Sequence, residues 1–344
     1  MAPTNRSPQA STQHLAVFFL LAFGVLAAAV GYWTFVARGS LIARTDNPRA
    51  LIAYNRIQRG RILDSNGLPL AETVGQPGDY VRRYELSAAL VVGYASFRYG
   101  TSGIEAAADS ILTGADAEDE FARWWKHDLL GEPQIGRDVQ LTLDGELQRA
   151  AFNALDGRAG AIVIVDTANG AILAMASSPS FDPARIDADF ETITADANGP
   201  LVNRATLGLY RADALLDLFP HPLDLSQPPS LPIPTRAAED KRITPLHMAL
   251  VAAAIFNDGV MPAPRLIVDE DPQGHPIAIM PPADAEQVKE SMGAGFAATV
   301  PSGFDDRTLG WFIGLSPDGS RAMCVVIEDS TAAAASAAAF LTLK

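Results

Sequence analysis

Cysteine and lysine are both scarce in this chain of 344 residues. Its single cysteine, Cys324, excludes an intrachain disulfide and a multi-cysteine metal site. Only 4 of the 26 basic residues are lysines, and the formal net charge is -14. Nucleic-acid binding requires clustered cations, and the sequence holds no basic patch, so a nucleic-acid partner is excluded. We expect no metal and no cofactor, because metal-ligand spacing is absent from the five histidines, His14, His127, His221, His247 and His275.

Charge is also missing from one long stretch near the N-terminus. The 22 residues from Leu15 to Val36 are uncharged, and as a helix they would span about 33 Å, the thickness of a bilayer's hydrocarbon core. Tyr32 and Trp33 suit the aromatic belt at a membrane interface. We predict an uncleaved membrane anchor over residues 15–36, preceded by a short tail over residues 1–14. A buried core helix and a cleaved signal peptide are the alternatives.

Residues 37–137 are expected to form a small mixed α+β module. Asn66 and Gly67 stand between short apolar runs, a pattern that predicts a β-hairpin. Apolar residues then recur at helical spacing between Ile104 and Ile111. The stretch RWWKHDLLGEPQIG, residues 123–136, is expected to be a linker whose aromatic pair packs rather than binds.

Residues 138–344 are expected to form a second unit. Turn residues at Asn169-Gly170 and at Pro317–Gly319 predict a hairpin near each end of this unit. Helical patterns lie between the hairpins, and an alanine-rich stretch from Thr331 to Phe340 predicts a final helix. Together these elements indicate an antiparallel sheet covered by helices, and an α+β fold for the chain.

Several stretches, taken in order, resemble the class B penicillin-binding proteins, which are membrane-anchored transpeptidases that cross-link peptidoglycan. In the first module they are RGRILDSNGLPLAET and VVGYASFRYGTSGIE. In the second they are LTLDGELQRAA, GAIVIVDTANGAILAMASSPSFDP, LVNRATLGLY, ITPLHMALVAAAIFNDG and WFIGLSP. The resemblance implies a single-pass protein of the cytoplasmic membrane with its N-terminus inside. It also implies that a pedestal over residues 37–137 and a shortened transpeptidase-like, serine β-lactamase-like domain over residues 138–344 lie outside the cytoplasm.

The family's catalytic motifs are S-x-x-K, S-x-N and K-T-G. A serine hydroxyl needs a nearby base to become nucleophilic, and a lysine three residues later on a helix lies on the same face. In the family, LVNRATLGLY leads into P-P-G-S-x-x-K. Aligned without gaps, this chain has Ala214 at the nucleophile position and Asp217 at the lysine position. The K-T-G region aligns near Ala294, Gly295 and Phe296, and no displaced copy of any motif occurs elsewhere in the sequence.

The missing motifs predict a catalytically inactive family member, not an enzyme, that is a scaffold or regulator of peptidoglycan synthesis. The partners implied by the resemblance are a polytopic glycan polymerase or other wall-synthesis proteins, together with peptidoglycan. Two alternatives stay open: a non-catalytic module that binds muropeptides or stem peptides, and an active D,D-transpeptidase with an unrecognised nucleophile. We further expect Arg204 to brace loops of the domain and Cys324 to be buried and unreactive.

Overall fold

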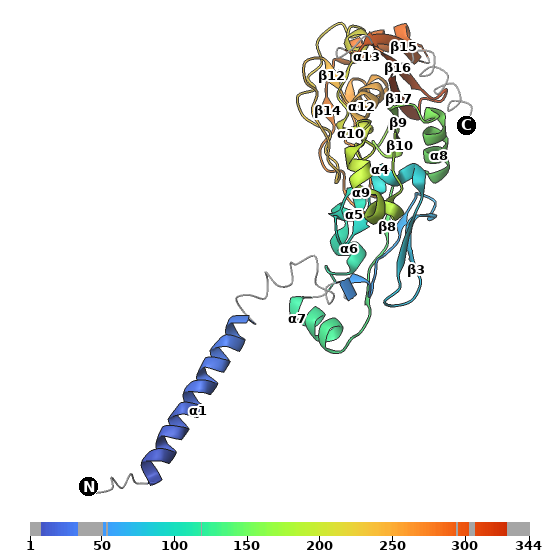
Figure 1. The fold of residues 1–344 in the computed structure, drawn as a ribbon. Coiled ribbons are helices and arrows are strands. Elements are labelled where there is room, and N and C mark those ends of the chain that lie inside the picture. Colours follow the sequence, from blue (N-terminus) through green and yellow to red (C-terminus); the bar gives the residue numbers. More distant parts are fainter. Residues whose placement is uncertain are drawn as a thin grey trace. The chain divides into compact units, whose positions relative to one another are not determined.

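The chain forms two compact units, Met1–Tyr54 and Asn55–Lys344, in a computed structural model (Figure 1). The residues that the structure describes are 8–33, 51–52, 54–117, 119–293, 295–302 and 307–328. The predicted alanine-rich helix at Thr331–Phe340 lies outside them. The predicted domain boundary between residues 137 and 138 stays a prediction.

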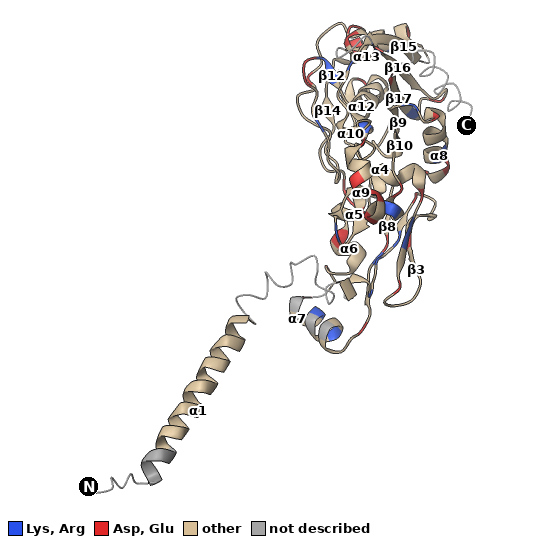
Figure 2. Cartoon of the chain, in the orientation of Figure 1, with Lys and Arg blue, Asp and Glu red and all other residues tan. Residues whose placement is uncertain are grey.

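The first unit contains the helix α1 (Pro8–Gly31). Its segment Gln13–Gly31 is long and apolar enough to cross a membrane. The described part of the helix contains neither acidic nor basic residues, as Figure 2 shows, and its large apolar side chains are exposed. Among the described residues no part of the apolar segment is buried, so this helix fits a single-pass membrane anchor rather than a core helix.

The second unit begins with short strands and helices that form the expected mixed α+β module. Ile62 and Ala71 are paired across the hairpin predicted at Asn66-Gly67, and Gly67 has a left-handed backbone with φ of 80°. The sheet order is β4-β3-β2-β8, and β2 pairs in parallel with β8. The elements of this module are β1 (Ile57–Gln58), β2 (Ile62–Leu63), β3 (Pro69–Val74), β4 (Val81–Tyr84), η2 (Leu86–Ala88), α4 (Ala89–Val92), β5 (Ala95–Ser96), β6 (Gly100–Thr101), α5 (Gly103–Ala107), α6 (Asp109–Thr113), α7 (Glu120–Arg123), η3 (Trp124–Leu129), β7 (Gln134–Ile135) and β8 (Val139–Gln140).

A buried carboxylate, that of Glu105, joins three segments of this module. Glu105 is fully buried, and its Oε2 accepts a hydrogen bond of 2.9 Å from Nε of Arg59. Its other oxygen, Oε1, accepts a bond of 2.8 Å from Nε of Arg82. The two arginine side chains are only 8% and 10% exposed. Two arginines on one buried carboxylate therefore tie α5 to β4 and to the segment between β1 and β2.

Close backbone packing explains a glycine beside this cluster. A Cβ atom at Gly60 would lie 1.9 Å from the carbonyl oxygen of Arg137, so any larger residue would push the two backbone segments apart.

A second buried carboxylate, that of Asp64, accepts hydrogen bonds from the backbone N–H groups of Asn66, Leu68 and Gly145. Because Gly145 begins α8, Asp64 connects the hairpin turn directly to the first helix of the following segment.

The largest sheet has five strands in the order β10-β9-β17-β16-β15, and all its pairs are antiparallel. Both hairpins predicted in this region are confirmed: β9 pairs with β10, and β16 pairs with β17. The strands are β9 (Gly160–Asp166), β10 (Ile172–Ser178), β15 (Gly295–Pro301), β16 (Thr308–Leu315) and β17 (Arg321–Glu328). Pairing of β9 with β17 brings together two ends of the segment that are far apart in the sequence.

Helices cover both faces of this sheet, so the predicted α+β fold is confirmed. On one face α8 (Gly145–Leu155) packs on residues that include Ile162, Ile164 and Val325. On the other face α12 (Pro245–Phe256) packs on residues that include Val163, Cys324 and Val326. Neighbouring residues of β9 and β17 thus serve opposite cores, as the period of two along a strand requires. Capping by the side chain of Asp144 starts α8, and the side chain of Thr244 caps α12.

The remaining elements connect the hairpins. They are η4 (Pro183–Arg185), α9 (Ile186–Ala195), α10 (Arg204–Leu207), β11 (Tyr210–Arg211), α11 (Asp213–Leu216), β12 (Arg242–Ile243), β13 (Val260–Met261), β14 (Ile277–Ala278) and α13 (Pro282–Met292). Between α11 and β12 the proline-rich stretch forms no helix or strand, as its composition predicts.

We predict that Glu105→Gln lowers the free energy of unfolding by about 3–5 kcal/mol, because Arg59 and Arg82 would keep their charges without a buried counter-charge. The midpoint of chemical unfolding of the detergent-solubilised full chain measures this change. Asp138→Asn is the matched control, since Asp138 pairs with Arg61 at 2.6 Å with both side chains exposed. That pair should contribute about 1 kcal/mol or less. Equal losses of stability in the two variants would contradict the conclusion that Glu105 holds the three segments of the module together.

Candidate functional site

The predicted nucleophile position lies on α11, a single helical turn packed beside the edge strand β15. Leu215 is fully buried, and Ala214 packs partly against the same core. Just before the helix, the backbone oxygen of Arg211 accepts a bond of 2.8 Å from the indole of Trp311, a buried residue of β16. Apolar packing and this hydrogen bond hold α11 against the end of the sheet.

Charged side chains gather on the outer side of α11. The ammonium group of Lys241 lies 3.8 Å from a carboxylate oxygen of Asp213 and 3.8 Å from one of Asp217. A bond of 2.9 Å from Nε of Arg211 lowers the pKa of Asp213, and Lys241 adds to this effect. Asp213 is therefore anionic at neutral pH, and Lys241 is its partner from a distant part of the sequence.

A tight turn places Lys241 next to Asp213 and Asp217. Asp240 and Lys241 both adopt left-handed backbone conformations, with φ of 46° and 59°. The chain reverses there, and β12 then pairs with β11, the strand just before α11. Left-handed backbone costs a non-glycine residue about 1–2 kcal/mol, so the surrounding pairing must hold this turn in place.

An open cleft of about 800 Å³ lies next to these charges. It is bordered by the end of α11, the following proline-rich stretch and β12, and its polar lining includes Asp217, His221, Lys241 and Arg242. His221 is itself positioned by Asp284 of α13, with 2.7 Å between Nδ1 and a carboxylate oxygen. The cleft therefore offers both anionic and cationic groups to a ligand, on an exposed surface.

The region aligned with K-T-G lies at the start of β15. Ala294 is outside the described residues, while Gly295 and Phe296 pair with Gly314 and Ile313 of β16. A Cβ atom at Gly295 would lie 2.4 Å from the ring of Phe312, so glycine fits a close approach between the two strands. The alignment of this region with K-T-G stays a prediction.

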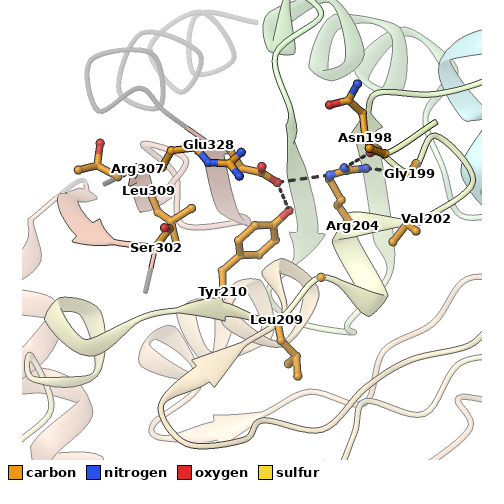
Figure 3. A pocket seen from close by; sticks show the side chains of 13 residues that line it. Asn198, Gly199, Val202, Arg204, Leu209, Tyr210, Ser302, Arg307, Leu309 and Glu328 are labelled. Atoms are coloured by element: carbon orange, nitrogen blue, oxygen red, sulfur yellow. Dashed lines mark hydrogen bonds and ion pairs between the residues drawn. The ribbon is translucent and has the colours of Figure 1, made fainter. Parts of the chain in front are cut away.

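A second pocket, of about 370 Å³, lies near the other end of β15 and β16 (Figure 3). Arg204 and Tyr210 both point toward Glu328, which is at the end of β17. Oε1 of Glu328 accepts a bond of 3.1 Å from the hydroxyl of Tyr210 and lies 3.4 Å from Nε of Arg204. Arg204 also donates to the backbone oxygens of Asn198 and Gly199. The expectation that Arg204 braces loops of the domain is confirmed.

The hydroxyl of Tyr210 is a fixed donor in this pocket. Burial, with the neighbouring carboxylate of Glu328, raises the pKa of Tyr210 well above its ordinary value. The phenol therefore stays protonated and cannot serve as a base near neutral pH. The hydrogen bond from Tyr210 and the guanidinium of Arg204 together hold the carboxylate of Glu328 in the pocket. Through Arg204, the end of β17 is thereby connected to the loop before α10.

Two isolated residues considered from the sequence are both in the core. Cys324 is fully buried in β17, and burial raises the pKa of its thiol, as expected for an unreactive cysteine. His247 is fully buried in α12, and neither ring nitrogen has a hydrogen-bond partner among the described residues. Burial lowers the pKa of His247 to about 4, so its ring is neutral at ordinary pH.

Comparisons with known proteins agree with this fold. Residues 59–139 match the penicillin binding protein A dimerisation domain. Peptidoglycan D,D-transpeptidase PbpA of Mycolicibacterium smegmatis is 33% identical over 218 residues, which are 58% of this chain and 44% of the relative. Peptidoglycan D,D-transpeptidase MrdA of Escherichia coli strain K12 is 42% identical over 83 residues, 23% of this chain and 13% of the relative. The chain is a relative of the class B penicillin-binding proteins.

Solved structures show the same fold over a larger part of the chain. Penicillin-binding protein A from M. tuberculosis, solved as an imipenem acyl-enzyme complex, has a TM-score of 0.70 at 20% identity. That match covers 84% of this chain and 98% of the solved chain. The D,D-transpeptidase domain of a peptidoglycan glycosyltransferase from Eggerthella lenta has a TM-score of 0.65 at 23% identity, with 84% and 97% covered. The aligned stretch nevertheless spans less than half the length of the curated relatives above.

The prediction that this relative of penicillin-binding proteins is not an enzyme is wrong. Its relatives are named peptidoglycan D,D-transpeptidases, which places it in an enzyme family, and no finding shows inactivity. The prediction rested on residue triplets found along the sequence. Lys241 shows the weakness of that inference, because folding brings it to Asp213 and Asp217 of the α11 segment from more than twenty residues away. Spacing in the sequence does not determine which groups meet in the folded site.

Three features of the site had no signal in the sequence. The pairing of β11 with β12 that positions Lys241 rests on two residues in each strand. Glu328 follows an apolar strand with nothing to relate it to Arg204, which is 124 residues away. The contact of His221 with Asp284 depends on how the proline-rich stretch meets α13. Each of these three contacts joins residues far apart in the sequence, in segments that show no helical or strand periodicity.

We predict a loss of stability on acidification that depends on His247. The pKa of the folded-state ring is about 4 against 6.5 for a free histidine. The unfolded chain therefore takes up a proton first as the pH falls, and stability that is complete above pH 6.5 declines until the pH has passed about 4. The difference between the two pKa values corresponds to about 3 kcal/mol.

The free energy of unfolding of the full chain, measured at several pH values, tests this dependence. His247→Leu should flatten the curve between pH 6.5 and 4, the interval set by the two pKa values. Met248→Leu, at an equally buried neighbour in α12, should keep the wild-type slope. An unchanged slope in His247→Leu would show that other groups cause the acid sensitivity.

Proposed function

We propose that this chain takes part in peptidoglycan synthesis as a membrane-anchored protein whose bulk lies outside the cytoplasm. In this proposal its module over residues 37–137 binds a wall-synthesis partner, such as a polytopic glycan polymerase, and so has a scaffolding or regulatory role. The observation that carries the proposal is the match of residues 59–139 to a dimerisation domain, in a module whose Glu105 cluster is intact. The apolar helix α1 supports the membrane location.

A rigid module suits a binding role. Arg59, Arg82 and Glu105 fix three segments by charge-assisted bonds, and Arg59 also reaches Asp109 of α6 at 2.8 Å. A surface on such a module is preorganised, so little conformational entropy is lost when a partner binds.

Site-specific crosslinking in native membranes tests this proposal. A photoreactive amino acid at Val81, an exposed residue of β4, should crosslink the full chain to a membrane protein of wall synthesis, identified by mass spectrometry. The same amino acid at Ile277, an exposed residue of β14, is the control and should give no such product. Crosslinks to no wall-synthesis protein, or equal products from both positions, would reject the proposed role of the module.

A second candidate function, binding of muropeptides or stem peptides, is supported by the cleft beside α11. Lys241 and Arg242 offer cations to peptide carboxylates, and Asp217 offers an anion to peptide amines. In this proposal Ala214 and Asp217 occupy the positions of the motif serine and lysine, and Ala294, Gly295 and Phe296 those of the third motif. A nucleophile for acyl transfer would then have to come from another residue of the fold.

We predict that a soluble stem peptide binds the full chain and that Lys241→Ala weakens its affinity about fivefold, since an exposed charge pair contributes about 1 kcal/mol. Isothermal titration calorimetry measures the affinity. Lys289→Ala is the control, because Lys289 lies over the ring of Phe256 and does not line the cleft. Flat titrations of the unmodified chain would exclude this function, while covalent labelling by a fluorescent penicillin would assign acyl transfer to the protein.

A further inference from the structure

Exposed apolar side chains are concentrated on one short segment of the second unit. Among the described residues from 55 onward, ten large apolar side chains are exposed, and five of them lie between residues 121 and 135. Outside this segment the exposed ones are scattered, at Leu68, Val81, Leu86, Val202 and Ile277. Within it they are Phe121 at 70% exposure, Trp125 at 46%, Leu129 at 54%, Leu130 at 57% and Ile135 at 62%. We call the first four of these the α7–η3 apolar face.

The α7–η3 apolar face is one continuous surface. The rings of Phe121 and Trp125 are stacked with 6.3 Å between their centroids. In the wide helical turn η3, the N–H of Leu130 donates to the carbonyl oxygen of Trp125 at 3.0 Å, so Leu130 lies one turn above Trp125. Leu129 adjoins Leu130 in the chain. The sequence predicted that this aromatic pair would pack in a linker, but the described ring of Trp125 is on the surface.

The polarity of this helical segment is reversed relative to that of a helix packed on a protein core. Its large apolar residues whose side chains are described, Phe121, Trp125, Leu129 and Leu130, are exposed, while Ala122, Arg123, Lys126 and His127 are half-buried. Figure 2 shows the basic residues of this segment in blue. A helix of a water-soluble surface normally buries its apolar side, so this arrangement indicates that a further apolar phase or partner meets the outward side.

The segment is also close, within its unit, to the point where the tether from α1 arrives. The second unit begins at Asn55, and β1 then pairs in parallel with β7, with Ile57 opposite Gln134. Strand β7 follows η3 after a few residues. Gly31 and Asn55 are separated by 23 residues, which allow at most about 80 Å between them. A membrane spanned by α1 is therefore always within reach of this edge and is present there at high effective concentration.

We propose that the α7–η3 apolar face is a second membrane contact, which docks the unit on the lipid surface. Tryptophan, phenylalanine and leucine on one side of a helix and basic residues beside them are the composition of helices that lie in the interfacial region of a bilayer. Arg123 and Lys126 are half-buried in this segment, and in this proposal they turn to anionic headgroups when the face docks, in a chain whose net charge of -14 otherwise opposes such a surface.

Docking would restrict the unit to a narrow range of heights and orientations above the bilayer. It would act without any protein partner and would be strongest on anionic lipid. The contact is thus independent of the partner binding proposed above for the same module.

Fluorescence of a label at Leu129 tests the lipid contact. The full chain with Leu129→Cys carries an environment-sensitive dye and is reconstituted at one copy per vesicle of phosphatidylglycerol and phosphatidylcholine with nitroxide-labelled lipid. The native Cys324 is fully buried and should not react in the folded protein. We expect a blue shift of the dye and quenching by the nitroxide lipid. A dye at Ile277→Cys, in β14, is the matched exposed control and should show neither effect.

A double variant and a change of lipid composition test the same contact further. Phe121→Ser with Trp125→Ser should reduce quenching at position 129 to the level of the control, and the exposed side chains should leave the thermal midpoint unchanged. Pure phosphatidylcholine should reduce the quenching in the unmodified background. Equal quenching at positions 129 and 277 would overturn the proposal. So would protection of position 129 only at high protein density or only with an added wall-synthesis protein, since either result assigns the face to a protein partner.

Discussion

The pairing of β9 with β17 is the constraint on which the rest of the large sheet and its helices depend. It sets Val163 opposite Cys324 and closes a chain segment of about 150 residues. Loop-closure entropy grows only with the logarithm of length, about 0.6 kcal/mol for each doubling. The length of the connection between the two hairpins therefore has little effect on whether the sheet forms. The proline-rich stretch, which contains no helix or strand, is part of that connection.

The cleft follows from the same constraint. Because β17 lies between β9 and β16, strand β15 is left at the edge of the sheet, and α11 lies beside it. An edge strand with a single helical turn leaves room that side chains of the proline-rich stretch only partly fill. The charges of Asp213, Asp217 and Lys241 can share this place because it is exposed, so their desolvation cost is small.

The sequence predicted the parts of this structure that obey local rules. Turn residues at Asn66-Gly67, Asn169-Gly170 and Pro317–Gly319 gave three hairpins, because glycine with positive φ and proline constrain the chain wherever they occur. It could not predict the position of Lys241, which depends on a left-handed turn and on pairing with a distant strand. Nor could the sequence predict that Trp125 is exposed, because the identity of an apolar residue does not show whether its side of the helix is buried or exposed.

The module that begins the second unit combines buried apolar residues, such as Ile62, Ile104 and Leu112, with a buried charge cluster. A buried carboxylate with two arginines adds little net stability, but it tolerates only one geometry, since a misplaced partner leaves a buried charge unpaired. Because Arg59 follows β1 directly, this pairing also limits how β1 and its partner β7 can move relative to α5 and β4. The α7–η3 apolar face precedes β7 by a few residues, so it lies next to the part of the module that these buried charges hold.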